Sequence, residues 1–190
     1  MRIIGGKARG LRLAEVGTGD AQAHLRPTSD RVRESIFNLL INSQNLSLEG
    51  LRVLDLFAGT GALGLEALSR GAAHCTFVDD GATARALLRE NIEKMRAMGV
   101  TRVLRRDATT LGDNRGPGFD LVFLDPPYGK SLGALALGTA QAGGWLAPQA
   151  YIVWEDASPQ IPPAGFTLID QRRYGETHVT FLRPEARHAP

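Results

Sequence analysis

The fold of this chain is decided by the stretch Leu51-Arg52-Val53-Leu54-Asp55-Leu56-Phe57, which runs directly into Ala58-Gly59-Thr60-Gly61-Ala62-Leu63-Gly64. The apolar residues 51–57 predict a buried strand, and residues 61–70 have the apolar spacing of a helix. The three glycines have G-x-G-x-x-G spacing around the turn between them, which is typical of a loop that binds the nucleotide part of a cofactor. Gly59 and Gly61 let the backbone turn tightly and approach a ligand closely.

Strands and helices alternate along the chain on either side of this loop. The pattern predicts further strands at residues 75–79, 102–105, 119–125 and 151–154, and helices at residues 29–41, 82–98 and 131–143. Such alternation predicts an α/β fold in which a mostly parallel sheet carries helices on both faces. Residues 166–174 and 178–182 are two more strands with no room for a helix between them, so they should close the sheet as an antiparallel hairpin.

Length and composition predict a soluble protein with one main domain. The 190 residues are 43% hydrophobic and 22% charged, and no apolar run approaches the roughly 18 residues that span a bilayer. We expect residues 1–25 to form a small basic β-hairpin extension, residues 26–183 the main domain and residues 184–190 a loose tail. The N-terminus lacks the apolar core of a signal peptide, and the single cysteine, Cys75, cannot form an internal disulfide, so a cytoplasmic location is expected.

Positive charge is concentrated near the N-terminus. Residues 1–33 contain seven basic and three acidic side chains, a net charge of +4, whereas the rest of the chain has 15 basic and 17 acidic side chains, a net charge of −2. A basic end on a slightly acidic body predicts a polyanionic partner such as a nucleic acid, although a solvated basic surface has the same composition. The phosphate contacts are expected among Arg9, Arg12, Arg26 and Arg33.

Acidic residues indicate what the glycine loop binds. Asp79 lies 20 residues past Gly59, at the end of the second strand, where a carboxylate can accept hydrogen bonds from ribose hydroxyls. Asp80 is a rival for this role. Asp55 would repel the pyrophosphate of a dinucleotide but suits the cationic methionine end of S-adenosylmethionine; its alternative role is to order the loop. Asp107, at the end of the third strand, can accept from the N6 amine of adenine.

A second motif, Asp125-Pro126-Pro127-Tyr128, ends the apolar strand at residues 119–124. Two prolines stop a strand because neither can donate to its ladder. The carboxylate of Asp125 and the carbonyl of Pro126 can accept the two hydrogens of an exocyclic amine, which frees the nitrogen lone pair for attack. Tyr128 can stack on the base. The motif therefore predicts a site for an amine on a planar base, and its structural alternative is a proline turn with a packing tyrosine.

At these positions the chain resembles the class I S-adenosylmethionine-dependent methyltransferases that modify amino groups of bases. More narrowly, it resembles the RsmD family of 16S rRNA guanine-N2 methyltransferases. The narrower resemblance rests on Arg2-Ile3-Ile4-Gly5-Gly6, Arg26-Pro27-Thr28-Ser29-Asp30-Arg31-Val32-Arg33-Glu34, Phe37-Asn38, the Asp55–Gly61 loop and Asp125–Tyr128. It covers nearly the whole chain, from Met1 to about Leu182.

The resemblance implies a Rossmann-like, seven-stranded, mostly parallel sheet of order 3-2-1-4-5-7-6, with strand 7 antiparallel. It implies methyl transfer to N2 of guanine 966 of 16S rRNA, presented within an assembling 30S subunit. The catalytic residues would be Asp125, Pro126 and Tyr128. The residues that bind S-adenosylmethionine would be Asp55, Phe57, Gly59, Gly61, Asp79, Asp107 and Ala108. Where the family usually has Glu at the end of the second strand, this chain has Asp79.

Three other functions stay open at this point. A DNA adenine-N6 or cytosine-N4 methyltransferase uses the same kind of motif as Asp125–Tyr128, although 190 residues leave little room for a target-recognition domain. An NAD-dependent oxidoreductase would use the glycine loop but leaves Asp125–Tyr128 unexplained. A non-enzymatic RNA-binding module would need neither motif for chemistry. The four histidines are scattered along the chain, so no metal site is expected. No membrane partner is expected either, because no apolar run is long enough to span a bilayer.

Overall fold

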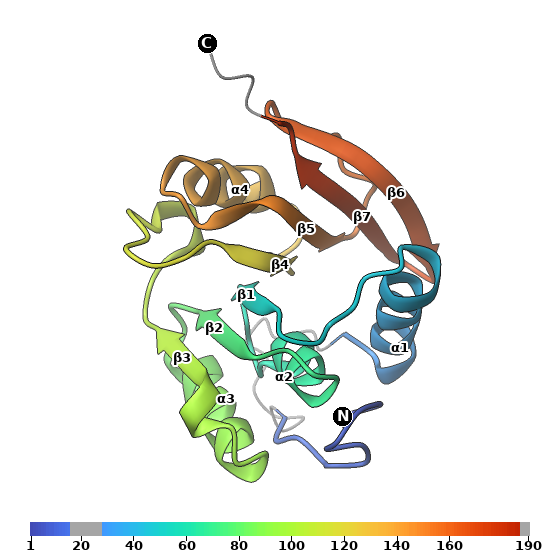
Figure 1. Cartoon of the computed structure of the whole chain (residues 1–190), viewed down its shortest axis with the longest axis vertical. Coiled ribbons are helices and arrows are strands. Elements are labelled where there is room, and N and C mark those ends of the chain that lie inside the picture. The colour runs from blue at the N-terminus through green and yellow to red at the C-terminus, as the bar shows by residue number, and fades with distance from the viewer. Residues whose placement is uncertain (16–27, 187–190) are drawn as a thin grey trace.

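The computed structural model describes residues 1–15 and 28–186 (Figure 1). The strands and helices occur in the predicted order. Their bounds are α1 Asp30–Asn38, the π-helical turn η1 Leu39–Ser43, β1 Arg52–Leu56, α2 Ala62–Ser69, β2 His74–Val78, α3 Ala82–Lys94, the short 3₁₀ turn η2 Met98–Val100, β3 Thr101–Leu104, the 3₁₀ turn η3 Ala108–Thr110, β4 Phe119–Leu124, α4 Leu132–Ala142, β5 Leu146–Asp156, β6 Phe166–Tyr174 and β7 Thr177–Pro184.

The seven strands form one sheet in the order β3-β2-β1-β4-β5-β7-β6. Neighbouring strands from β3 to β5 are parallel, and β7 is antiparallel to both β5 and β6. This confirms the predicted α/β class, the strand order and the closing hairpin. Strand β5 begins five residues earlier than predicted, because Leu146 pairs with Phe119 ahead of a register shift in the ladder.

Helix α3 is shorter than predicted and ends at Lys94. Arg96 adopts a left-handed conformation with φ of 53°. The N–H of Ala97 then donates to the carbonyl of Ile92, which satisfies one of the free carbonyls at the helix end. Helix termination of this kind usually uses glycine. An arginine at this position therefore carries no clear signal that the helix ends.

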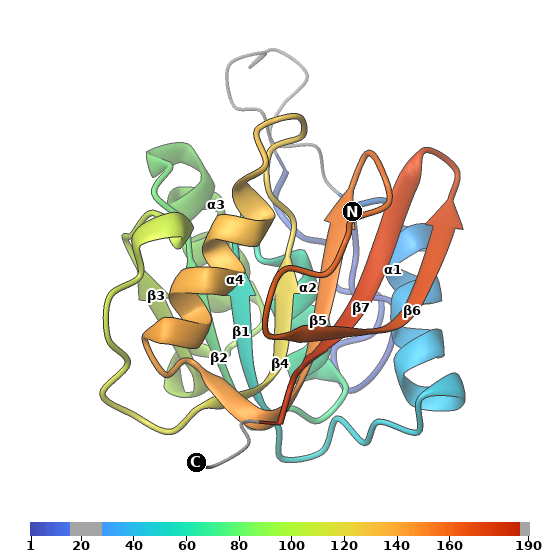
Figure 2. The same ribbon diagram turned by 90° about the horizontal axis from the view of Figure 1, so that it is seen from above.

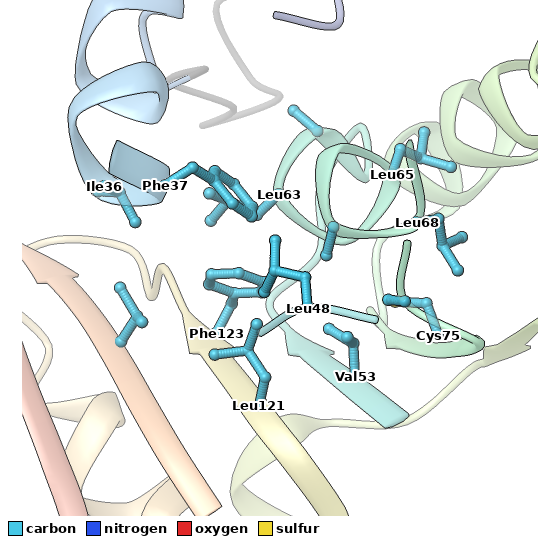
Figure 3. Close-up of a cluster of buried hydrophobic side chains, with 14 of the residues drawn as sticks. Ile36, Phe37, Leu48, Val53, Leu63, Leu65, Leu68, Cys75, Leu121 and Phe123 are labelled. Atoms are coloured by element: carbon cyan, nitrogen blue, oxygen red, sulfur yellow. The ribbon is translucent and has the colours of Figure 1, made fainter. Parts of the chain in front are cut away.

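Helices cover the sheet unequally (Figure 2). Helices α1, α2 and α3 lie on one face, where Phe37 and Leu65 pack with Val53 and Phe123 of the sheet (Figure 3). Leu88 of α3 belongs to the same cluster. Helix α4 lies on the other face, over a second apolar cluster. That cluster comprises Leu54, Leu56, Val78, Ala108, Leu111, Phe119, Val122, Leu124, Ala136, Leu137, Ala140, Trp145, Ile152, Trp154, Phe166 and Leu182. The two clusters explain why the central strands are apolar on both faces.

Helix α2 is the centre of the larger cluster, and all eight of its residues are buried. A helix that is apolar nearly all round must be covered on every side. The sheet covers one side, and residues 1–15 cover the outer side. The N–H groups of Ile4 and Gly5 donate to Glu66, and Ile3 and Leu13 are buried in the core.

The predicted N-terminal hairpin is reduced to an antiparallel bridge between Arg2 and Arg12. The N–H of Ile3 donates to the carbonyl of Leu11, and the N–H of Gly10 donates to the carbonyl of Ile3. The expected boundary at residue 25 lies outside the described residues, so the division into an extension, a main domain and a tail stays a prediction. No helix within residues 1–15 and 28–186 is long and apolar enough to cross a membrane.

Arg33 is buried completely, which corrects the expectation that it contacts RNA phosphate. Its guanidinium lies 3.0 Å from a carboxylate oxygen of Asp30 and 3.5 Å from one of Glu66. It also donates to the carbonyl oxygens of Arg2 and Thr28. With no exposed surface and several internal partners, Arg33 holds α1, α2 and the N-terminal segment together. The sequence could not show this, because its helical position alone left the side chain's direction open.

We expect Arg33→Met to destabilise the protein by about 3–5 kcal/mol, because the buried Glu66 keeps only Arg70 as a cationic partner and the carbonyl oxygens of Arg2 and Thr28 lose a donor. Urea unfolding followed by circular dichroism measures the effect. Arg31→Met is the matched control in the same helix; Arg31 is exposed, and its loss should cost less than about 0.5 kcal/mol. Equal effects of the two substitutions would contradict a structural role for Arg33.

Candidate active site

The functional residues gather at the edge of the sheet where the parallel strands end. Asp55 is the penultimate residue of β1, Asp79 follows β2, Asp125 follows β4, and Glu155 is the penultimate residue of β5. Because parallel strands end at the same edge, these carboxyl groups share one region of the surface. That edge is also where ligands bind in open α/β sheets.

The glycine loop between β1 and α2 has an unusual backbone. Gly59 and Gly61 have φ angles of 56° and 80°, in the left-handed region that glycine tolerates. Phe57 also has a positive φ, 58°, although it carries a side chain. Such strain in a non-glycine residue clusters at binding sites. Gly64 has a different role, because a Cβ there would lie 2.4 Å from the ring of Phe77, so it allows α2 to pack closely on β2.

Asp79 lies directly beside the glycine loop. Its two carboxylate oxygens accept from the N–H groups of Gly59, at 2.9 Å, and Gly81, at 2.8 Å. A carboxylate has about four acceptor sites, so both oxygens keep capacity for hydroxyl donors. Burial raises the pKa of Asp79, and the hydrogen bonds from Gly59 and Gly81 lower it. Asp80 is exposed, so the geometry favours Asp79 over Asp80 as the ribose ligand.

Asp55 is buried, with 2% of its surface exposed. Its Oδ2 accepts from the N–H of Gly64 at 3.0 Å, in the first turn of α2. This is the loop-ordering role that the sequence left open. Burial raises the pKa of Asp55 well above its usual range, and the neighbouring Asp125 and Asp79 raise it further. A role in cofactor binding stays a prediction.

Asp107 and Ala108 follow β3 at the same edge. The Oδ1 of exposed Asp107 accepts from the N–H and the hydroxyl of Thr109, at 2.8 and 2.7 Å, and so caps the 3₁₀ turn η3. Ala108 is buried against the sheet. The second carboxylate oxygen of Asp107 takes no part in this cap. The predicted adenine contact is therefore compatible with the geometry and stays a prediction.

The corner at Asp125–Tyr128 leads from β4 into α4. Pro126 is buried, Asp125 and Tyr128 are half-buried, and Gly129, with φ of 77°, reverses the chain before the helix begins. Burial raises the pKa of Asp125 to about 7; the hydrogen bond from Thr28 lowers it, and Asp156 raises it. A raised pKa on a carboxyl group at a ligand-binding edge is typical of a functional residue.

Two residues of this corner were missed by the sequence reasoning. Glu155, 2% exposed, lies at the end of β5, and Thr28 precedes α1. The Thr28 hydroxyl lies 3.1 Å from each carboxyl oxygen of Glu155 and 3.5 Å from Oδ2 of Asp125. A signal for Glu155 existed, since it follows the apolar run 151–154 as Asp125 follows its own strand. The sequence reasoning named Thr28 only within the motif Arg26–Glu34; the residue that caps α1 is Ser29, which accepts from the N–H of Val32.

The electrostatics of this edge favour a cationic ligand. Each buried carboxyl group has another carboxylate among the causes that raise its pKa: Asp125 and Asp79 at Asp55, Asp156 at Asp125, and Asp125 and Asp55 at Glu155. A positive charge bound here would stabilise the ionised carboxylates, whereas an anion would be repelled. Within residues 1–15 and 28–186 no group of three or more histidine, cysteine or acidic residues could hold a metal ion.

The other basic residues predicted to contact RNA lie apart from one another. Arg9 is exposed in a turn whose neighbour, Ala8, donates to Ser69 at the far end of α2. Arg12 is exposed opposite Arg2, which is tied to the first turn of α1. Arg26 lies outside the described residues. The phosphate contacts of Arg9, Arg12 and Arg26 therefore stay predictions.

Asp125→Asn should stabilise the protein more at pH 8 than at pH 5, by about 1–3 kcal/mol. The pKa of Asp125 is raised in the folded state, so wild type loses stability as the pH rises from about 4 through about 7, and the asparagine variant is spared this loss. Urea unfolding at both pH values tests this. Exposed Asp113→Asn is the control. A gain of equal size at pH 5 and pH 8 would show that Asp125 titrates normally.

Comparison with known proteins identifies the family. The sequence matches the family described as "Conserved hypothetical protein 95" over residues 1–183. It is 36% identical over 190 residues to ribosomal RNA small subunit methyltransferase D of Escherichia coli K12, covering 98% of this chain and 91% of that protein. The protein of the same name from Haemophilus influenzae is 35% identical over 181 residues, covering 92% of this chain and 89% of that protein.

A solved structure shows the same architecture. The yhhF protein of Escherichia coli superimposes with a TM-score of 0.81 at 32% identity, covering 98% of this chain and 99% of that chain. The match in sequence and fold thus runs through the glycine loop, the carboxylate edge and the N-terminal segment alike. The chain belongs to the conserved hypothetical protein 95 family, the RsmD-type methyltransferases whose motifs it carries.

Proposed function

We propose that this protein transfers a methyl group from S-adenosylmethionine to the N2 amine of a guanine in 16S rRNA. The observation that carries the proposal is the carboxylate edge, where buried Asp55, half-buried Asp125 and the glycine loop lie together. This edge suits a cationic cofactor and an amine that releases one proton when it is methylated. The relatives named ribosomal RNA small subunit methyltransferase D support the choice of substrate.

The chain's own residues fit S-adenosylmethionine. Asp79 would accept from the ribose hydroxyls with its remaining acceptor capacity, and Asp107 would accept from the adenine amine. The left-handed turn at Phe57, Gly59 and Gly61 leaves backbone close to the ligand. When bound, S-adenosylmethionine supplies an electrophilic methyl group on a sulfonium centre. The negative edge around Asp55 favours this cation and disfavours the pyrophosphate of NAD.

Asp125 would act on the nucleophile. The lone pair of a guanine N2 amine is delocalised into the ring, so the amine attacks poorly without help. Asp125 and the carbonyl of Pro126 would accept its two hydrogens and hold the nitrogen toward the methyl group, and Tyr128 would stack on the base. The ionised form of Asp125 accepts the hydrogen bond more strongly and can take the proton that the methylated amine releases, a step for which its raised pKa suits it.

Recognition of the RNA is proposed to use the N-terminal third of the chain. Exposed Arg31 lies in the first turn of α1, and exposed Arg12 pairs with Arg2, whose N–H donates to Asp30 of the same turn. Arg9 follows Ala8, which is bound to Ser69 at the other end of α2, and the eight residues of this helix span about 12 Å. RNA that reaches Arg9 must therefore extend past the methylated base. Guanine 966, presented in an assembling 30S subunit, is the proposed target.

A methylation assay with labelled S-adenosylmethionine tests the proposal. The substrates are 30S particles from cells that lack this protein, naked 16S rRNA and plasmid DNA. We expect label in N2-methylguanine of the particles and none in DNA. Label in DNA adenine or cytosine, without label in the particles, would support the rival DNA methyltransferase.

Asp125→Asn should reduce the methylation rate by at least about 100-fold, because asparagine keeps an acceptor oxygen but loses the negative charge that strengthens the hydrogen bond and the capacity to take the released proton. The affinity for S-adenosylhomocysteine, measured by calorimetry, should stay within about threefold of wild type, since Asp125 is proposed to contact the amine rather than the cofactor. The Asp113→Asn control should methylate at the wild-type rate. An Asp125→Asn variant with wild-type activity would exclude the assigned role.

Arg9→Gln and Arg12→Gln should each reduce the slope of log affinity for 16S rRNA against log salt concentration by about 0.7–0.9, the contribution of one phosphate contact. Filter binding between 50 and 200 mM salt measures the slope. Arg115→Gln is the control, since Arg115 is exposed in the loop before β4, at the opposite edge of the sheet. Slopes that do not change in either variant would remove that arginine from the RNA-binding surface.

A further inference from the structure

A single hydroxyl group bridges two carboxyl groups at the active corner. Oγ1 of Thr28 lies 3.1 Å from both oxygens of Glu155 and 3.5 Å from Oδ2 of Asp125. The three residues come from distant parts of the chain: the segment before α1, the end of β5 and the end of β4. Neither Thr28 nor Glu155 has a part in the chemistry proposed above.

Thr28, Glu155 and Asp125 share one hydroxyl hydrogen. A threonine hydroxyl has one hydrogen and two acceptor sites, so it can donate to only one carboxylate at a time. Two ionised carboxylates sharing one buried hydrogen would repel each other. A proton on one of the two carboxyl groups removes this repulsion and supplies the second hydrogen.

The proton belongs on Glu155. Glu155 is more deeply buried than Asp125, and the carboxylates of Asp125 and Asp55 both face it. Burial raises its pKa well above the usual range, whereas the hydrogen bond from Thr28 and the charge of Arg33 lower it. A protonated Glu155 can donate its O–H to Oγ1 of Thr28. The hydroxyl hydrogen of Thr28 then points to Oδ2 of Asp125.

We infer that Thr28 and Glu155 are positioning residues that hold Asp125 in its reactive orientation. Neutral Glu155 turns the Thr28 hydroxyl onto Oδ2 of Asp125, so that the carboxylate cannot rotate and its other oxygen is directed to the amine of the base. The inference rests on the proposed methyl transfer and adds two residues to it. It also explains why a glutamate lies buried at the end of β5.

The position of Thr28 is itself held by the protein interior. Its carbonyl oxygen accepts from Nη1 of Arg33 at 3.3 Å, and Arg33 is paired with Glu66 of α2. Ser29, the next residue, caps α1. The hydroxyl of Thr28 is thus presented to the corner by a fixed backbone, which a positioning role requires.

Thr28→Val tests the inference in the 30S methylation assay, because valine keeps the shape and removes the hydroxyl. We expect kcat to fall about tenfold or more at saturating cofactor and particles, with the affinity for S-adenosylhomocysteine within about threefold of wild type. The acid limb of kcat against pH should move to higher pH, since the Thr28 hydrogen bond lowers the pKa of Asp125 while Asp156 opposes it. Thr28→Ser should restore both properties.

Thr167→Val, on the exposed edge strand β6, is the control and should behave as wild type. Wild-type kcat and an unmoved acid limb in Thr28→Val would overturn the inference. So would equal losses of kcat and cofactor affinity, which indicate general damage to the site. Failure of the wild-type protein to methylate the particles is a different result, because it overturns the proposed function before any variant is compared.

A second pair of variants, both at Glu155, tests the positioning role if Thr28→Val does not fold. Glu155→Gln keeps a neutral group that can donate to Thr28, whereas Glu155→Met keeps the length and removes the donor. We expect kcat of Glu155→Gln to exceed that of Glu155→Met by about tenfold, at similar thermal stability. Equal kcat values in the two variants would overturn the inference.

Discussion

The buried ion pair of Arg33 and Glu66 is the interaction on which the rest of the structure depends. Glu66 accepts from the backbone N–H groups of Ile4 and Gly5 and from Arg70, while Arg33 donates to the carbonyl of Thr28. The pair thereby joins the N-terminal segment, α1 and α2, which are three elements outside the sheet. Two buried charges are costly in themselves, so their use here is best understood as fixing geometry: they connect the helix behind the glycine loop to the residue that touches Asp125.

At the carboxylate edge, the edge of the sheet that carries Asp55, Asp125 and Glu155, buried acidic groups lower the stability of the fold. Asp55, Asp125 and Glu155 are placed where burial and mutual repulsion raise their pKa values. Apart from the hydrogen bond from Gly64 to Asp55, the packing does not require acidic residues there, because apolar residues of similar size would fill the space without this cost. The proposed function accounts for the loss of stability, since a site for a cationic cofactor and an amine that donates hydrogen bonds would need these groups. The positive φ of Phe57 is a further strain of the same kind.

Much of this could be predicted because it depends on neighbours in the chain. The strand and helix order, the closing hairpin and the positions of Asp55, Asp79 and Asp125 follow from hydrophobic periodicity and from strand ends, which are local signals. The predictions failed where distant segments meet. Arg33 was expected on the RNA surface and lies in the core, because the direction of a helical side chain depends on what packs against the helix. Glu155 and Thr28 were missed because their contact spans 127 residues.

The sequence by itself determined the class of the fold and the place of the corner at the end of β4, because a G-x-G-x-x-G turn and Asp125-Pro126-Pro127-Tyr128 each act through backbone constraints within a few residues. Only the tertiary structure decided which carboxyl groups share a hydrogen and which arginine is buried. It also decided that residues 1–15 cover α2. These outcomes depend on the distances between side chains from different elements, and on the low polarity of the interior that they share.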